Sequence, residues 1–270
     1  MTPLGLPLDS NDIFAFFAVL IRFTVLMAVF PLVGENTVPV QVKILLGTVL
    51  SFLLYPSLVA QGFVHPEQAA VWTGTTETLV KTIIWEAVFG VALGFASKIV
   101  FDMIVMSGDL IGTWMGFSSA SQYDPFYNGQ SQVISKILYA LGMLLFVSMD
   151  GHFYLFRAAA GSYQLVPIGG VKIGAAYGLT VIEAVSQMLR LALQMSAPAA
   201  IVFLCVNVFY GVVSRAMPQL NVLMLSFSVS ALVGLFVLGI SLPEMNATLR
   251  GVFGEYGESL WKVMRAMQSS

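Results

Sequence analysis

The sequence predicts an all-α membrane protein, and three observations predict it. Hydrophobic residues make up 58% of the 270-residue chain and charged residues only 10%, whereas soluble domains carry about 25% charged residues. Apolar runs of about 20 residues, long enough to cross a bilayer as a helix, recur along the chain. Residues 191–214 and 216–243 contain no charged side chain. A water-facing exterior cannot accommodate so much apolar surface, so lipid is expected to form part of the surroundings.

We expect about six apolar helices, arranged as kinked helical hairpins. Their approximate bounds are 13–33, 44–64, 83–106, 133–149, 189–214 and 220–242. The last two are predicted to form a hairpin, because Pro218 in the short turn between them disfavours continuation of the helix. The first four are less regular, since Arg22 interrupts the first, Pro56 the second and Glu86 the third. We therefore expect several of these four to bend, or not to cross lipid in the usual way.

The connections between these segments are predicted to differ in character. Residues 61–81 favour a polar loop with a short helix, residues 107–132 a long glycine-rich connection, and residues 151–180 a connection that contains Pro167. Residues 244–270 mix charged and apolar side chains, which favours an amphipathic surface helix. Lysine and arginine in the loops favour a cytoplasmic C-terminus. The side on which the N-terminus lies stays open, because one early re-entrant hairpin would reverse it.

Charge and motif content argue against several classes of function. The net charge of −2 is near neutral, so we expect no nucleic-acid partner. Two histidines and one cysteine lie far apart in the sequence and make no metal site. No catalytic or phosphate-binding motif is present, so we expect no cofactor and no enzymatic activity. The first twelve residues lack a basic region, so we expect no cleavable signal peptide.

Three glycines four residues apart, Gly108, Gly112 and Gly116, form a distinctive pattern. Small residues at this spacing share one helix face and let two backbones approach closely, so helix packing is one interpretation. The other interpretation depends on the neighbours Met115 and Phe117. Glycine gives the backbone freedom and methionine packs softly, which together favour a deformable constriction. Irregular backbone at membrane depth is tolerated only inside protein or along a cavity.

Charged residues inside the apolar segments are further candidates. A charge such as Arg22 near the middle of a membrane helix costs about 2.5–3.5 kcal/mol on insertion unless it is paired or solvated. We favour a structural role for Arg22 at a subunit or helix interface, with a partner that the sequence does not identify. Lys98 and Asp102 lie one helical turn apart, and we favour an internal ion pair over a proton relay.

Other residues have plainer structural interpretations. His152 follows Gly151 after the fourth segment, and a hydrogen-bonded loop histidine is the simpler alternative to a titrating switch. Pro198 is expected to kink the fifth segment. Asn207 and Asn221 are expected to form hydrogen bonds between helices rather than to bind a ligand.

Several short motifs follow one another in a characteristic order. The most specific are Gly108-Asp109-x-Ile111-Gly112-x-x-Met115-Gly116-Phe117-Ser118, Asp124-Pro125 and Arg215-x-x-Pro218-Gln219-Leu220-Asn221. The others are Arg22, Pro31, Pro39, Lys43, Pro56, Gly90, Gly94, Phe95, Gly151, His152, Pro167, Ile168, Gly169, Pro198 and Asn207. This order resembles the FliR family of flagellar biosynthesis proteins, which includes the matching component of virulence type III secretion systems. Asp109 departs mildly from the family, which usually has Glu there.

The resemblance implies a subunit of the type III protein export gate. It implies one copy of this chain in an assembly with several copies of FliP and FliQ, in the bacterial inner membrane at the flagellar basal body. FlhB would be a cytoplasmic-side partner, and the cargo would be unfolded rod, hook and filament protein. The chain would form a single export-gate domain, with residues 13–180 similar to FliP, residues 181–243 similar to FliQ and residues 244–270 as a cytoplasmic amphipathic tail.

The resemblance also implies roles for particular residues. The segment from about residue 107 to 130 matches the loop that plugs the closed channel. The expected plug residues are Gly108, Gly112, Met115, Gly116, Phe117, Ser118, Tyr123, Asp124 and Pro125. The residues expected at subunit or helix interfaces are Arg22, Pro39, Lys43, Lys98, Asp102, Gly151, His152, Asn207, Arg215, Pro218 and Asn221.

Two alternative functions stay open at this point. A small-solute secondary transporter would use Arg22 with Lys98 and Asp102, although embedded carboxylates are few and no internal repeat is evident. The equivalent subunit of a virulence injectisome would have the same sequence features. A membrane enzyme is a third class, but it lacks any supporting motif.

Overall fold

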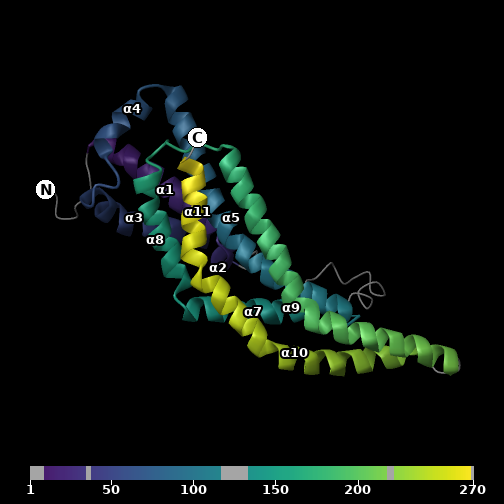
Figure 1. Cartoon of the computed structure of the whole chain (residues 1–270). Helices are drawn as coiled ribbons and strands as arrows, with labels where there is room; N and C mark the ends of the chain where they lie inside the picture. Colours follow the sequence, from purple (N-terminus) through teal and green to yellow (C-terminus); the bar gives the residue numbers. More distant parts are fainter. Residues whose placement is uncertain (1–8, 35–37, 117–132, 218–221, 269–270) are drawn as a thin grey trace. The chain divides into compact units, whose positions relative to one another are not determined.

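The computed structural model describes residues 9–34, 38–116, 133–217 and 222–268, and within these ranges it contains helices and no strand (Figure 1). Five described helices are long and apolar enough to cross a membrane. They are α1 (Ser10–Val29), α3 (Val40–Ala60), α5 (Thr76–Trp114), α9 (Ala175–Ala216) and the part of α10 (Val222–Gly254) from Ser228 onward. A sixth span results if α7 (Val133–Ser148) and α8 (Gly151–Leu165) act as one broken span. The predicted class of all-α membrane protein is confirmed.

The chain folds into two compact units. Unit 1 comprises Met1–Ile99, Asp150–Val185 and Glu255–Ser270, and unit 2 comprises Val100–Met149 and Ser186–Gly254. The chain passes from one unit to the other within α5, between α7 and α8, within α9, and between α10 and α11 (Tyr256–Gln268).

In unit 1, α1 and α3 pack closely along their length. A Cβ added to Gly47 would lie 2.5 Å from the Cα of Thr24, so only glycine lets the two helices approach this far. The Tyr55 hydroxyl donates to the backbone carbonyl of Asp12 over 3.1 Å. Pro56, predicted to interrupt the second helix, lies inside α3 near its end. There the missing N–H removes a single hydrogen bond and the helix continues to Ala60.

Helix α5 is longer than predicted at both ends. The short elements α2 (Pro31–Gly34), η1 (Pro66–Gln68) and α4 (Ala69–Thr73) precede it, and it then runs for 39 residues. It contains no proline, and close packing at its glycines offsets their cost of about 1 kcal/mol each in a helix. The glycine-rich connection therefore begins after Trp114 and not near residue 107.

Residues 151–165, predicted as part of a connection, form α8. Asp150, with a φ of 59°, breaks the helix between α7 and α8, and the two helices are bent by 64° at this point. Its small residues Ala158, Ala159 and Ser162 are buried. A helix with such short, mixed side chains lacks the long apolar run that a sequence-based prediction of a span requires.

Unit 1 also holds α11, whose apolar face is covered by protein. Trp261 lies over Gly161 of α8, where a Cβ would be 3.2 Å from the ring, and α8 and α11 run alongside one another (Figure 1). The hydroxyl groups of Tyr256 and Ser97 share a hydrogen bond of 2.5 Å. Burial raises the pKa of the Tyr256 phenol, an effect that the bond to Ser97 reduces. Leu260 and Met264 are almost fully buried.

Unit 2 contains α7, the C-terminal part of α5, and the antiparallel helices α9 and α10. The rings of Phe101, Phe146 and Phe253 form one cluster, with centroid separations of 5.1, 5.2 and 5.9 Å. The Tyr210 hydroxyl reaches the Ser226 carbonyl over 3.4 Å, which fits the predicted hairpin. Both helices exceed their predicted bounds, because α9 already begins at Ala175 and α10 continues through Pro243 to Gly254.

Candidate functional site

Unit 1 contains a fully buried ion pair between α1 and α5. Arg22 Nε donates to Glu86 Oε2 over 2.6 Å, and Arg22 Nη2 donates to Glu86 Oε1 over 3.0 Å. Arg22 Nη1 also donates to the Ser162 hydroxyl over 2.8 Å, and Nη2 to the Val166 carbonyl over 3.3 Å. The backbone N–H of Gly169 donates to Glu86 Oε1 over 3.0 Å. One arginine thus joins α1, α5 and α8.

The surroundings of this pair are aromatic and exclude water. The Arg22 guanidinium carbon lies 4.3 Å from the ring centre of Phe89 and 3.9 Å from that of Tyr163, so both aromatic faces meet the cation. Neither Arg22 nor Glu86 has any exposed surface. Each charge is compensated by the other and by several hydrogen bonds, as a buried ion pair requires. This arrangement holds helices together and offers no opening to a substrate.

Glycines allow α1 and α5 to approach closely enough for this pair to form. A Cβ on Gly90 would lie 2.7 Å from the backbone carbonyl oxygen of Arg22, and a Cβ on Gly94 would lie 2.7 Å from the Cβ of Val29. Small residues four apart on one face of a membrane helix serve this kind of contact.

The sequence marks Arg22 as unusual but does not identify its partners. Glu86 interrupts the third apolar segment, but that segment also contains Lys98 and Asp102, so the sequence offers more than one acid as a partner for Arg22. Ser162, Val166 and Tyr163 gave no comparable signal, because they belong to a segment predicted to be a connection.

Unit 2 holds the described part of the expected plug at the C-terminal end of α5. Gly108 faces α7 so closely that a Cβ would collide with the backbone of Ser135. The Ser135 hydroxyl donates to the carboxylate of Asp109. Gly112 is buried one turn further along the same helix. This end of α5 is therefore packed tightly against α7.

The last described residues of the expected plug end the helix. Met115 is 1% exposed. Its thioether lies directly on Gly234 of α10, so a Cβ added to Gly234 would collide with the Met115 side chain. Gly116 has a φ of 82°, which L-residues rarely adopt, and its N–H donates to the Thr113 carbonyl over 3.0 Å. The remaining expected plug residues, Phe117, Ser118, Tyr123, Asp124 and Pro125, lie outside the described residues.

The expected interface residues are spread over several helices. Pro39 is exposed and immediately precedes α3, whereas Lys43 is buried in the first turns of that helix. Lys98 is exposed on α5 and Asp102 is half-buried one turn later, the spacing that an ion pair between them requires. Asn207 is exposed in the C-terminal part of α9.

The other expected interface residues lie at helix ends. Gly151 is buried at the start of α8. His152 belongs to the same first turn and not to a loop; its ring lies 4.4 Å from that of Phe153, and its Nδ1 has no hydrogen-bond partner among the described residues. Arg215 is exposed in the last turn of α9. Pro218 and Asn221 lie outside the described residues.

These features form two clusters, each of which lies within one unit. The buried pair belongs to unit 1 and the end of α5 to unit 2. Within the described ranges, no group of three or more His, Cys, Asp or Glu side chains could hold a metal ion. The described residues thus show closely packed helices in each unit and a glycine-rich end of α5.

The family model for bacterial export proteins, family 1, matches residues 13–256. The chain belongs to this family. Several curated proteins named flagellar biosynthetic protein FliR are similar over most of their length. The protein from Pectobacterium carotovorum is 28% identical over 260 residues, which cover 96% of each chain. The protein from Escherichia coli K12 is 27% identical over 240 residues, covering 89% of this chain and 88% of that one.

A relative from a distant bacterium gives the same result. The Bacillus subtilis FliR is 25% identical over 250 residues, covering 90% of this chain and 92% of that one. The predicted membership of the FliR family is confirmed. The bacterial export family and these relatives together support a component of the flagellar export apparatus, and the family is one of export proteins and not of known enzymes.

Proposed function

We propose that this chain is a channel-forming structural subunit of the type III protein export gate of the bacterial flagellum. The observation that carries the proposal is the family match over residues 13–256. Helices long and apolar enough to cross a membrane support a place in the bacterial inner membrane, at the flagellar basal body. The substrate class would be unfolded flagellar proteins, and the C-terminus would face the cytoplasm.

The partners in this proposal are FliP and FliQ, with one copy of this chain, and FlhB on the cytoplasmic side. Residues 13–180 would take a FliP-like position and residues 181–243 a FliQ-like position. Large exposed apolar side chains on the α9–α10 hairpin support contacts with neighbouring apolar helices, since Leu204 is 62% exposed and Phe236 is 70% exposed. A soluble monomer rarely leaves contiguous apolar patches of this kind.

The end of α5 would form the base of the gate. Gly108 lets the helix approach Ser135 of α7 closely, Gly112 is buried one turn further along, and the flexible side chain of Met115 lies on Gly234 of α10. A methionine in such a place can move aside at small cost, because its side chain is unbranched and polarizable. Gly116 lets the chain turn away from the helix. The residues Phe117, Ser118, Tyr123, Asp124 and Pro125 would complete the seal.

The seal is tested in cells that express this chain with FliP and FliQ. Deleting residues 112–121 should make the inner membrane leaky to ions, measured as potassium efflux. A milder change, Gly234→Leu, should also raise the leak, because it displaces Met115. The matched control is Gly239→Leu on the same helix, where an added Cβ meets nothing within 4 Å among the described residues.

Two results would count against the proposal. If the deletion leaves ion efflux unchanged while the complex still assembles, the gate role is wrong. If gentle extraction yields this chain as a solitary monomer although its partners are present, native mass spectrometry would show it and the subunit role would be lost.

A further inference from the structure

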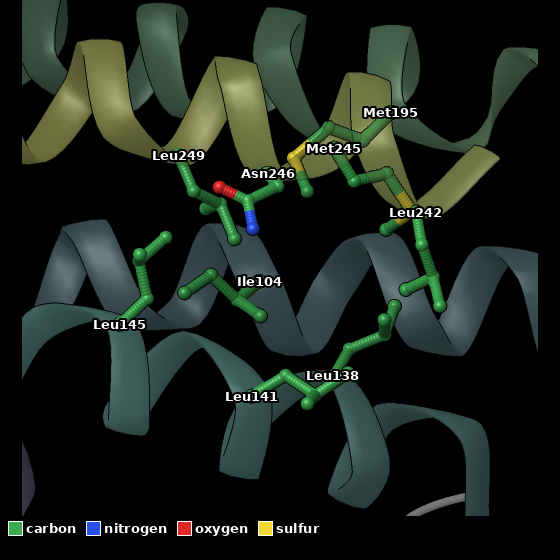
Figure 2. A pocket seen from close by; sticks show the side chains of 9 residues that line it. All are labelled: Ile104, Leu138, Leu141, Leu145, Met195, Leu242, Met245, Asn246 and Leu249. Atoms are coloured by element: carbon green, nitrogen blue, oxygen red, sulfur yellow. The ribbon is translucent and has the colours of Figure 1, made fainter.

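Unit 2 contains an apolar cavity that is open on one side (Figure 2). Its volume is about 190 Å³, larger than the cavity of about 150 Å³ that binds benzene in a well-studied protein core. It is lined by Ile104, Leu138, Leu141, Leu145, Met195, Leu242, Met245, Asn246 and Leu249, which come from α5, α7, α9 and α10. Leu141 is 43% exposed and Leu242 is 37% exposed, so these side chains mark the open side.

One polar side chain stands at this otherwise apolar cavity. Asn246 Oδ1 accepts a hydrogen bond of 2.8 Å from Arg250 Nε. The amide nitrogen of Asn246 points into the space between α10 and α5 (Figure 2). Asn246 and Arg250 are both exposed and lie one turn apart on α10, so this bond holds the guanidinium beside the Asn246 amide. It uses one of the five N–H donors of the arginine, so the group keeps further donors for an anion.

The cavity lies near the C-terminal end of the apolar part of α10. The charge-free run of this helix ends at Pro243, and Arg250 lies in the last turns of the apolar span Ser228–Gly254. Basic side chains at such helix ends reach lipid head groups. An acyl chain in the cavity would thus have its phosphate near Arg250.

We propose that this cavity binds an anionic phospholipid, with part of one acyl chain among the leucine and methionine side chains. The lipid phosphate would accept hydrogen bonds from Arg250 and from the Asn246 amide. An acyl chain that leaves the bilayer gains little from the hydrophobic effect, because lipid tails are as apolar as the cavity. The preference of the cavity for one phospholipid over another therefore depends on the charge of the lipid head group. The site goes beyond the proposed export function and does not depend on it.

The test uses the full chain purified in detergent and mixed with equal amounts of phosphatidylglycerol and phosphatidylethanolamine that carry the same acyl chains. Native mass spectrometry then counts the lipid molecules retained by the protein. The wild type should retain about fivefold more phosphatidylglycerol, the preference that one basic residue near a charged surface gives. Arg250→Gln should bring the two lipids close to equal retention, whereas Arg250→Lys should keep the preference.

Two further variants separate the site from general surface charge. Arg190→Gln removes a charge from an exposed position on α9, five residues before Met195 and so on a different face of that helix. It should leave the lipid preference unchanged. Leu141→Trp should fill the open side of the cavity and reduce retention of both lipids. Circular dichroism shows whether each variant keeps its helix content.

Several outcomes would overturn the proposal. The first is equal retention of the two lipids by the wild type. The second is an equal loss of the phosphatidylglycerol preference in Arg190→Gln and Arg250→Gln. The third is unchanged lipid retention in Leu141→Trp. A side chain of a partner subunit found in the cavity of the assembled gate would also overturn it. Lipid retention is measured on the chain without partners, so a negative result there does not contradict the export proposal. Likewise, a failure of the gate to assemble in cells does not contradict the lipid result.

Discussion

At the scale of single residues, the buried pair of Arg22 and Glu86 explains why charges occur inside apolar segments. The carboxylate accepts three hydrogen bonds, two from Arg22 and one from the Gly169 N–H. The guanidinium donates four and lies between two aromatic rings. The sequence indicates both charges, but it does not pair them, because several other charges in these segments could also have served as partners. The close approach of α1 and α5 determines that Glu86 is the residue that pairs with Arg22.

Glu86→Gln removes one charge and keeps the side-chain volume. It should lower the stability of the chain by about 3–5 kcal/mol, because it leaves Arg22 buried without its counter-charge. Chemical unfolding of the full chain in detergent measures this loss. Glu77→Gln is the matched control on the same helix, since its ion pair with Lys81 is exposed to solvent, and it should cause no measurable loss.

A double variant sharpens this prediction. Arg22→Met with Glu86→Leu removes both charges, and it should be less destabilising than either single change. If Glu86→Gln and Glu77→Gln have the same small effect, the buried pair does not stabilise unit 1 and the interpretation is wrong.

At the scale of elements, glycine positions decide which helices touch. The spacing of Gly90 and Gly94 predicts a packing face, and the structure shows what they face, namely the backbone of α1. Element lengths were harder to predict. A sequence-based prediction ends α5 near its glycines because they lower helix propensity, yet packing against α7 and α10 keeps the helix intact. It misses α8 because that helix lacks a long apolar run.

Gly90→Ala tests this account of packing. The added methyl would lie 2.7 Å from a backbone oxygen of α1 that cannot rotate away, so we expect a loss of about 1–3 kcal/mol in the unfolding free energy. Gly211→Ala on α9 is the control, because nothing lies within 4 Å of its Cβ position among the described residues. That change should stabilise the isolated chain by up to about 1 kcal/mol. Equal effects of the two substitutions would contradict the close approach.

At the scale of the whole molecule, the exterior is that of a protein made for an apolar environment. Composition alone predicts this, and the long exposed apolar side chains of α3, α9 and α10 agree with it. Only part of the division into two units is marked in the sequence, because two of the four crossings lie inside the continuous helices α5 and α9. The other two crossings lie between helices, at Asp150 and after Gly254, where the apolar pattern is interrupted.

Cys205, the single cysteine of the chain, tests whether α9 lies in lipid. It is exposed on the surface of this helix. In lipid nanodiscs it should react far more slowly with a water-soluble maleimide than in unfolding detergent, because the reaction needs a thiolate in contact with water. The control is Ser259→Cys in a Cys205→Ser background, at an exposed position on α11. Equal reaction rates at the two positions in nanodiscs would show that α9 faces water.

The buried pair also constrains how the protein is made. Arg22 and Glu86 are separated by 64 positions, and ribosomes add about 5–20 residues per second. The first helix therefore exists for about 3–13 s before its counter-charge has been synthesised. During that interval an uncompensated arginine cannot settle in the hydrocarbon core without cost. The insertion machinery must hold α1 at a polar site until α5 emerges, so the two helices are expected to enter the bilayer together.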